Sequence, residues 1–148
     1  EKLLSNGHDA EALLTSVFTL EKTISRSLKI AIFARGFSVS QTKQLLSRKG
    51  FEELKATWGI FDRSYRGLPE FIGNECWQNI PRAVKMRNDL VHGNKVYKLS
   101  KCKEFATHVI SALKKLRSIV QTEYGRDPWL KITGKRTPRL QWFDKYNP

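Results

Sequence analysis

The stretch DAEALLTSVFTLEKTISRSLKIAIFARG, residues 9–36, decides the fold class of this chain. Its apolar side chains recur every three to four residues, which is the spacing of one face of an α-helix. They are Leu13, Leu14, Val17, Phe18, Leu20, Ile24, Leu28, Ala31 and Ile32. Asp9 is a typical helix-starting residue and Gly36 a typical terminator, so we predict one long amphipathic helix between them.

The rest of the chain repeats this pattern in segments that glycine and proline separate. We predict a helix capped by Ser40 and ended by Gly50, one from Phe51 to Phe61, one beginning at Asn79 or Ile80, and one capped by Ser100 and closed by Gly125. Residues 62–74 read as an irregular connection, and a kinked start at Glu75 is the alternative for the following helix. No alternating pattern predicts a strand. We therefore expect an all-α domain over residues 1–125, an antiparallel helical bundle of four to five helices.

From Arg126 the composition changes to a basic, proline-broken C-terminal extension, residues 126–148. Lys135, Arg136 and Arg139 accompany Trp142 there, and cations beside aromatic rings are the usual means of binding single-stranded nucleic acid. The alternative is that the rings of this extension pack on the bundle and complete its core.

Composition restricts the classes of function. Hydrophobic residues make up 40% and charged residues 28%, which is typical of a globular domain. The formal charge of +13 favours a polyanionic partner, nucleic acid before acidic membrane, unless the basic surface only maintains solubility. We find neither a membrane span nor a signal peptide. Cys76 and Cys102 lack disulfide or zinc spacing, so we expect a cytoplasmic protein without metal or other cofactor.

The heptapeptide Arg87-Asn88-Asp89-Leu90-Val91-His92-Gly93 carries the groups best suited to chemistry. Arginine grips a phosphate with two parallel N–H bonds, histidine transfers protons near neutral pH, and the glycine is expected to end the helix. Arg87 falls on the helical stripe of Ile80 and Val84. It therefore needs an acidic partner, or the stripe faces a cleft or a second subunit. Arg87 and His92 are five positions apart, which is about 140° around an ideal helix. A single helix therefore does not direct both side chains at the same atom unless its last turn loosens.

This heptapeptide resembles the R-x4–6-H signature of the HEPN superfamily in its R-N-x-x-x-H form, and the order of helices over residues 9–125 is similar to that of a HEPN domain. The resemblance implies a metal-independent endoribonuclease of toxin–antitoxin, abortive-infection or antiviral systems. It also implies a homodimer with one composite site, in which Arg87 and His92 are catalytic and Asn88 supports them. Because RNA carries its own nucleophile, the 2′-OH, we expect a 2′,3′-cyclic phosphate as product.

Further residues are candidates for supporting roles. Asp89 lies inside the motif. Glu21 lies on the apolar stripe of the first helix, where the alternative is a boundary carboxylate that reaches solvent or a lysine. The candidate RNA contacts are Lys95, Lys98, Lys135, Arg136, Arg139 and Trp142.

Other interpretations stay open. The chain is alternatively a non-catalytic HEPN module that binds RNA or a partner protein, or an unrelated basic adaptor for nucleic acid. The motif is alternatively an Arg–Asp pair with a terminal histidine that caps carbonyls. Because an unrestrained ribonuclease harms its host, we expect a cognate antitoxin or a regulatory domain or subunit. The chain begins at Glu1 rather than Met, and we expect it to be a trimmed or excised piece.

Overall fold

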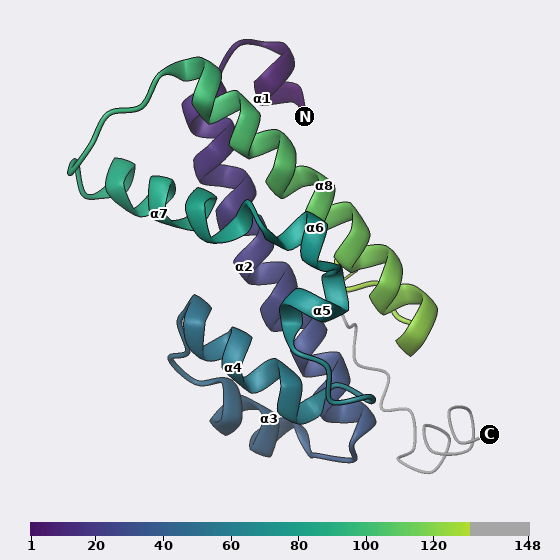
Figure 1. Cartoon of the computed structure of the whole chain (residues 1–148). Helices are drawn as coiled ribbons and strands as arrows, with labels where there is room; N and C mark the ends of the chain where they lie inside the picture. Colours follow the sequence, from purple (N-terminus) through teal and green to yellow (C-terminus); the bar gives the residue numbers. More distant parts are fainter. Residues whose placement is uncertain (131–148) are drawn as a thin grey trace. The chain divides into compact units, whose positions relative to one another are not determined.

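The computed structural model describes residues 1–130, and all regular secondary structure in this range is α-helical (Figure 1). The helices are α1 (Lys2–Ser5), α2 (Asp9–Ala34), α3 (Val39–Leu46), α4 (Phe51–Phe61), α5 (Leu68–Ile72), α6 (Asn74–Trp77), α7 (Ile80–Val91) and α8 (Leu99–Tyr124). The predicted all-α class is confirmed. Within residues 1–130, no helix is long and apolar enough to cross a lipid bilayer.

The helices belong to two compact units. The first unit comprises Glu1–Lys22 and Pro69–Leu116, and the described part of the second comprises Thr23–Leu68 and residues 117–130. Two of the three boundaries fall inside a long helix, α2 or α8, so each of these helices contributes its first part to one unit and its last part to the other. The third boundary lies between Leu68 and Pro69, at the start of α5.

The first unit buries one face each of α2, α7 and α8. Its core includes Leu13, Val17, Leu20, Ile80, Ala83, Met86, Phe105, Val109 and Ala112. Within each helix the buried residues follow one another at spacings of three or four, which are those of a single face, and burial of that face stabilises the unit. Burial, and then the charge of Asp9, raise the pKa of Cys102, so the first turns of α2 and α8 are neighbours.

Within this unit α2 and α8 run in the same direction (Figure 1). The predicted antiparallel bundle does not exclude this, because opposite directions are expected of consecutive helices that a short loop joins. Here the whole of α3 to α7 lies between them in the sequence, so no short connection imposes opposite directions. The helical class therefore follows from local patterns, whereas the direction of this pair depends on the long connection.

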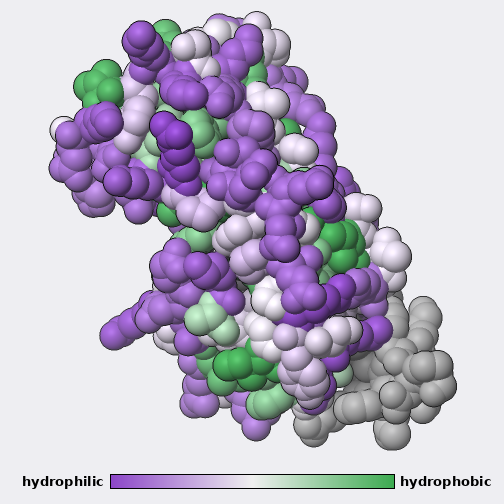
Figure 2. Space-filling view, in the orientation of Figure 1, coloured by the Kyte–Doolittle hydropathy of each residue, from purple (hydrophilic) through white to green (hydrophobic). Residues whose placement is uncertain are grey.

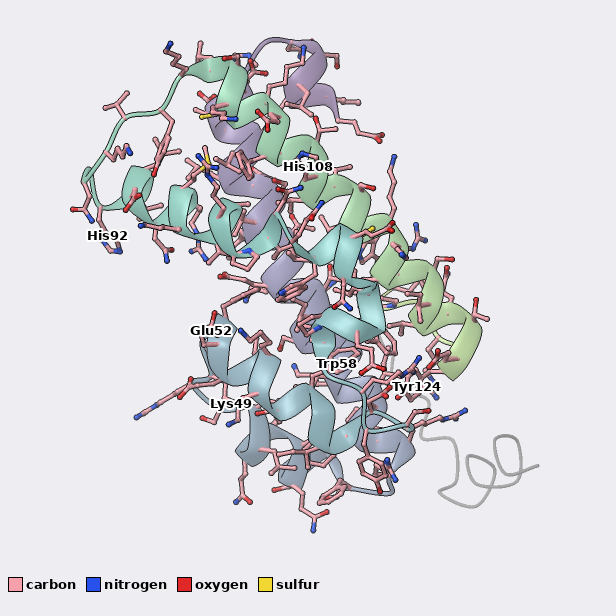
Figure 3. All side chains as sticks on the ribbon, viewed as in Figure 1. Lys49, Glu52, Trp58, His92, His108 and Tyr124 are labelled. Carbon is pink, nitrogen blue, oxygen red and sulfur yellow. The ribbon has the colours of Figure 1, made fainter. Side chains whose placement is uncertain are left out.

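The second unit contains α4, whose bounds agree with the predicted Phe51–Phe61. Its inward face carries Phe51, Leu54, Trp58 and Phe61, all buried, and Trp58 is among the labelled side chains of Figure 3. The N–H of Gly50 donates to Oε2 of Glu53 at 2.8 Å, which satisfies a backbone donor at the start of the helix. The positions of these aromatic residues explain why the pattern predicted this helix well.

The start of α3 corrects the sequence prediction. Ser38, not Ser40, is the cap: its Oγ accepts from the N–H of Gln41 at 3.2 Å, and Oε1 of Gln41 accepts from the N–H of Ser38 at 2.8 Å. This reciprocal pair needs Glu or Gln three residues after the cap. Ser38 has Gln41 at that position, whereas Ser40 has Lys43.

Two other boundaries also differ in detail. α5 lies inside the stretch 62–74 expected to be irregular, and α6 begins at its last residue, Asn74. α7 starts separately at Ile80, as predicted, rather than continuing from Glu75. Gly73 separates α5 from α6 with a φ of 101°, a conformation that glycine adopts readily. Ser100 lies inside the first turn of α8, which begins at Leu99.

Candidate active site

The predicted motif lies at the C-terminal end of α7, immediately before the loop 92–98 that leads to α8. Gly93 has a φ of 67°, and its N–H donates to the carbonyl of Leu90 at 3.3 Å. The N–H of Asn94 donates to the carbonyl of Asp89 at 2.9 Å. These two bonds form a Schellman motif, which satisfies the last carbonyls of a helix and defines its end. The predicted helix end at Gly93 is confirmed.

His92 occupies the C-cap position of α7 and is exposed (Figure 3). Its backbone N–H donates to the carbonyl of Asn88 at 3.0 Å, so the backbone of His92 still follows the last helical turn. The imidazole is therefore held on a defined backbone while its ring remains accessible to a ligand.

Arg87 pairs with Glu21 of α2, and both residues belong to the first unit. Nη2 of Arg87 donates to Oε1 of Glu21. The two side chains are only 21% and 23% exposed, so solvent screens this pair less than an ordinary surface ion pair. Among the described residues, the buried Nε of Arg87 has no hydrogen-bond partner. The arginine on the apolar stripe thus has an acidic partner, and this partner is Glu21 rather than Asp89.

The remaining motif residues lie on a different side of α7. Lys85, Asn88 and His92 are all exposed, and their spacing of three and then four places them on one helix face. Arg87 is five positions before His92 and points about 140° away from it, since the helix does not loosen before its Schellman end. Sequence reasoning missed Lys85, although the same spacing rule identifies it.

Asp89 connects α7 to the loop that follows. The hydroxyl of Tyr97 donates to Oδ2 of Asp89 at 2.6 Å, and this bond raises the pKa of Tyr97 because the nearby carboxylate favours the protonated phenol. Nζ of Lys95 lies 5.2 Å from the centre of the Tyr97 ring, which is within cation–π range. Lys95 and Lys98 are exposed. The loop 92–98 is therefore attached at Tyr97 and presents two cations close in sequence to His92.

The other predicted nucleic-acid contacts, Lys135, Arg136, Arg139 and Trp142, lie outside the described residues. Comparisons with protein-family models, with curated proteins and with solved structures find no match to this chain. The residues of the motif and their geometry are therefore the observations that bear on function.

Proposed function

We propose that this chain is a metal-independent endoribonuclease of HEPN type that acts as a homodimer. The observation that carries the proposal is the split of the motif between two sides of one helix end. His92 and Asn88 are exposed on one side, and Arg87 is held by Glu21 on another. A helix that separates its phosphate-binding group from its proton-transfer group suits a site completed by a second copy.

A twofold dimer provides this completion in the simplest way. Two copies of α7 that face each other bring Arg87 of one copy toward His92 of the other, and the symmetry repeats the arrangement. The exposed Val91 at the end of α7 and the exposed Val96 and Leu99 beyond it supply apolar surface near the motif. Apolar surface in the centre of an interface is typical of homodimers.

The chemistry follows from the residue types. His92 deprotonates the 2′-OH of RNA or protonates the leaving 5′-oxygen, as general base or general acid. Arg87 holds the scissile phosphate and stabilises the negative charge that develops in the transition state. Asn88 orients His92 or donates to a phosphate oxygen. The products are a 2′,3′-cyclic phosphate and a free 5′-OH.

Basic side chains near the motif are expected to bind the phosphates of RNA beside His92. Lys85 lies on the face of Asn88 and His92, and Lys95 and Lys98 follow in the loop. Cations of this kind bind phosphates without reading sequence, so affinity should fall as salt rises. In the cell we propose a role as a toxin or antiviral effector in the cytoplasm, restrained by an antitoxin or by a regulatory domain or subunit.

One observation favours a second candidate, a non-catalytic HEPN module that binds RNA or a partner protein. The carboxylate of Glu21 already accepts a hydrogen bond from Nη2 of Arg87. A phosphate that binds Arg87 must compete with this carboxylate. If the pair persists in the presence of RNA, Arg87 acts as a structural residue and the surface only binds.

An RNA cleavage assay distinguishes the enzyme from the non-catalytic module. Purified chain is incubated with structured and unstructured RNAs in excess EDTA, beside Arg87→Ala, His92→Ala and Asn88→Ala variants. We expect cleavage by the parent chain and a loss of about 100-fold or more in rate for Arg87→Ala and His92→Ala. His108→Ala is the matched control, because His108 is a second histidine of the first unit that lies outside the motif. Cleavage that requires added metal, survives either substitution or proceeds equally on DNA contradicts the proposal.

A further inference from the structure

Tyr65 of the second unit is an exposed aromatic residue in an unfavourable backbone conformation. Its φ is 55°, in the left-handed region that side chains other than glycine rarely adopt. Its exposed fraction is 68%, so the ring contributes little to the core. Glycine would adopt this backbone without strain. A tyrosine at this position therefore carries backbone strain that glycine would avoid, and it gains little from burial.

The ring of Tyr65 is nevertheless fixed in place by Arg35. The guanidinium of Arg35 lies 4.7 Å from the ring centre, and Nη1 donates to the Tyr65 hydroxyl at 3.3 Å. Nη2 of Arg35 also donates to the carbonyl of Asp62 at 2.7 Å, which anchors the cation to the backbone. One face of the ring thus carries a fixed positive charge, and the ring loses little freedom when a ligand binds its other face.

The loop that contains Tyr65 is held in place by the buried carboxylate of Asp62. Asp62 is fully buried, and its Oδ2 accepts from the backbone N–H groups of Ser64 at 3.2 Å and Arg66 at 3.0 Å. Burial alone would raise the pKa of Asp62, but hydrogen bonds from Arg66 outweigh it and hold that pKa below its usual value. Nη2 of Arg66 also donates to Glu123 at 2.6 Å. Tyr65 therefore stands on a braced loop rather than on a flexible one.

The charge of the second unit favours an anionic ligand. In the described part of the second unit, basic side chains outnumber acidic ones about two to one. Three of the acidic groups are already engaged: Asp62 and Glu123 by Arg66, and Asp127 by Arg117. An aromatic ring with cations beside it is the arrangement that binds single-stranded nucleic acid, in which bases stack and phosphates meet the cations.

We propose that Tyr65 is a stacking site for a base of single-stranded RNA, with Arg35 on the opposite face of the ring. The site is separate from the motif on α7, because Tyr65 and Arg35 belong to the second unit and the motif belongs to the first. The inference shares with the proposed function only the identity of RNA as ligand, and it requires no cleavage. A protein partner is the competing occupant that the experiment must exclude.

The test measures binding of a fluorescent, unstructured 12-nucleotide RNA and of the same sequence as single-stranded DNA to the full chain. All variants carry His92→Ala so that RNA is not consumed. We expect Tyr65→Ala to weaken both ligands equally, by about 5- to 150-fold, the factor that 1–3 kcal/mol of stacking per base represents. Tyr65→Phe keeps the ring and should bind as the parent does. RNA that carries 5-iodouridine should cross-link to Tyr65 on irradiation, as mapped by mass spectrometry.

Two controls separate stacking from folding and from general loss of apolar surface. Tyr65→Gly removes the ring and its contacts with Arg35 but also relieves the backbone strain, so it should be more stable than Tyr65→Ala and bind as weakly. Ile60→Ala removes a side chain that is 64% exposed in the same unit, and it should leave affinity unchanged. An unchanged affinity of Tyr65→Ala overturns the inference. So does an equal loss in Tyr65→Phe or Ile60→Ala, or a loss restricted to RNA, which would indicate a contact to the ribose.

Because no variant in this test is scored by turnover, the two proposals fail independently. RNA cleavage that persists in Tyr65→Ala at saturating RNA leaves the ribonuclease proposal intact whatever happens to affinity. Binding that depends on Tyr65 in a chain without nuclease activity leaves the stacking site intact.

Discussion

At the scale of single residues, the pair between Glu21 and Arg87 makes a measurable contribution to stability. Glu21→Gln removes the charge that compensates Arg87, so we expect the free energy of unfolding, measured in urea, to fall by about 1 kcal/mol. Glu104→Gln is the matched control: its pair with Lys101 is exposed at 46% and 44%, and its loss should leave the free energy of unfolding nearly unchanged. In the double variant with Arg87→Met, no charge remains uncompensated, and part of the lost stability should return. Strict additivity of the two substitutions contradicts the pairing.

The lowered pKa of Asp62 predicts that the stability of the chain depends on pH. Although burial opposes it, hydrogen bonding to Arg66 lowers the pKa of Asp62 in the folded chain. A carboxyl with a lowered folded pKa stabilises the protein above its unfolded value, near 4, and this contribution is lost as the pH falls toward the folded value. We therefore expect the urea midpoint to decrease below about pH 4. Asp62→Asn should already be less stable at pH 7 and should show a flatter profile. Parallel profiles for the two chains exclude this role for Asp62.

At the scale of elements, the Schellman end of α7 controls the position of His92. A Cβ at Gly93 meets no atom within 4 Å, so Gly93→Ala introduces backbone strain without a clash. We expect Gly93→Ala to cost about 1 kcal/mol and Gly93→Asn less, since asparagine tolerates the left-handed region. Gly7→Ala is the matched control, because Gly7 has a φ of 76° and equally open surroundings. Urea denaturation measures stability, and only the Gly93 variant should also slow RNA cleavage. Equal slowing by Gly7→Ala contradicts the assigned role.

The sequence predicts those elements best whose signals are local. α4 follows from an apolar stripe and flanking residues within the same dozen positions, and the end of α7 follows from one glycine. Ser38 was missed because two serines compete as caps, and Gln41 decides between them through a side-chain bond. The partner of Arg87 lies beyond local patterns, because Glu21 is 66 positions away in the sequence. Stripe analysis shows that Arg87 needs an acid, but only the packing of α7 on α2 identifies it.

At the scale of the whole molecule, the sequence determines the total charge but not its distribution over the surface. Composition gives +13 for the chain and predicts a polyanionic partner, but it does not locate the surface that binds. Figure 2 shows hydrophilic side chains over most of one face, with separate apolar patches between them. The contacts within each unit supply the missing information. In the first unit Arg87 is compensated while Lys85 and His92 are exposed, and in the second unit Arg66 and Arg117 are compensated by acidic groups, so the excess charge lies on other basic side chains.

A site shared between two copies predicts that inactive variants complement each other. If Arg87 of one copy acts with His92 of the other, Arg87→Ala and His92→Ala chains are each inactive alone but complement each other when mixed. A mixed dimer contains one combination with both residues intact and one with neither. Random exchange makes about half of the dimers mixed, and each mixed dimer has one complete Arg87–His92 combination where the parent dimer has two. We therefore expect recovery of about a quarter of the parent rate. The measurement is RNA cleavage after the two variants are co-refolded, with each variant refolded alone as the control. Recovery should fail when one chain carries both substitutions and the other carries His92→Ala, because no combination is then complete. Complete absence of recovery in the first mixture, while size-exclusion chromatography with light scattering shows dimers, would mean that each copy acts with its own Arg87 and His92.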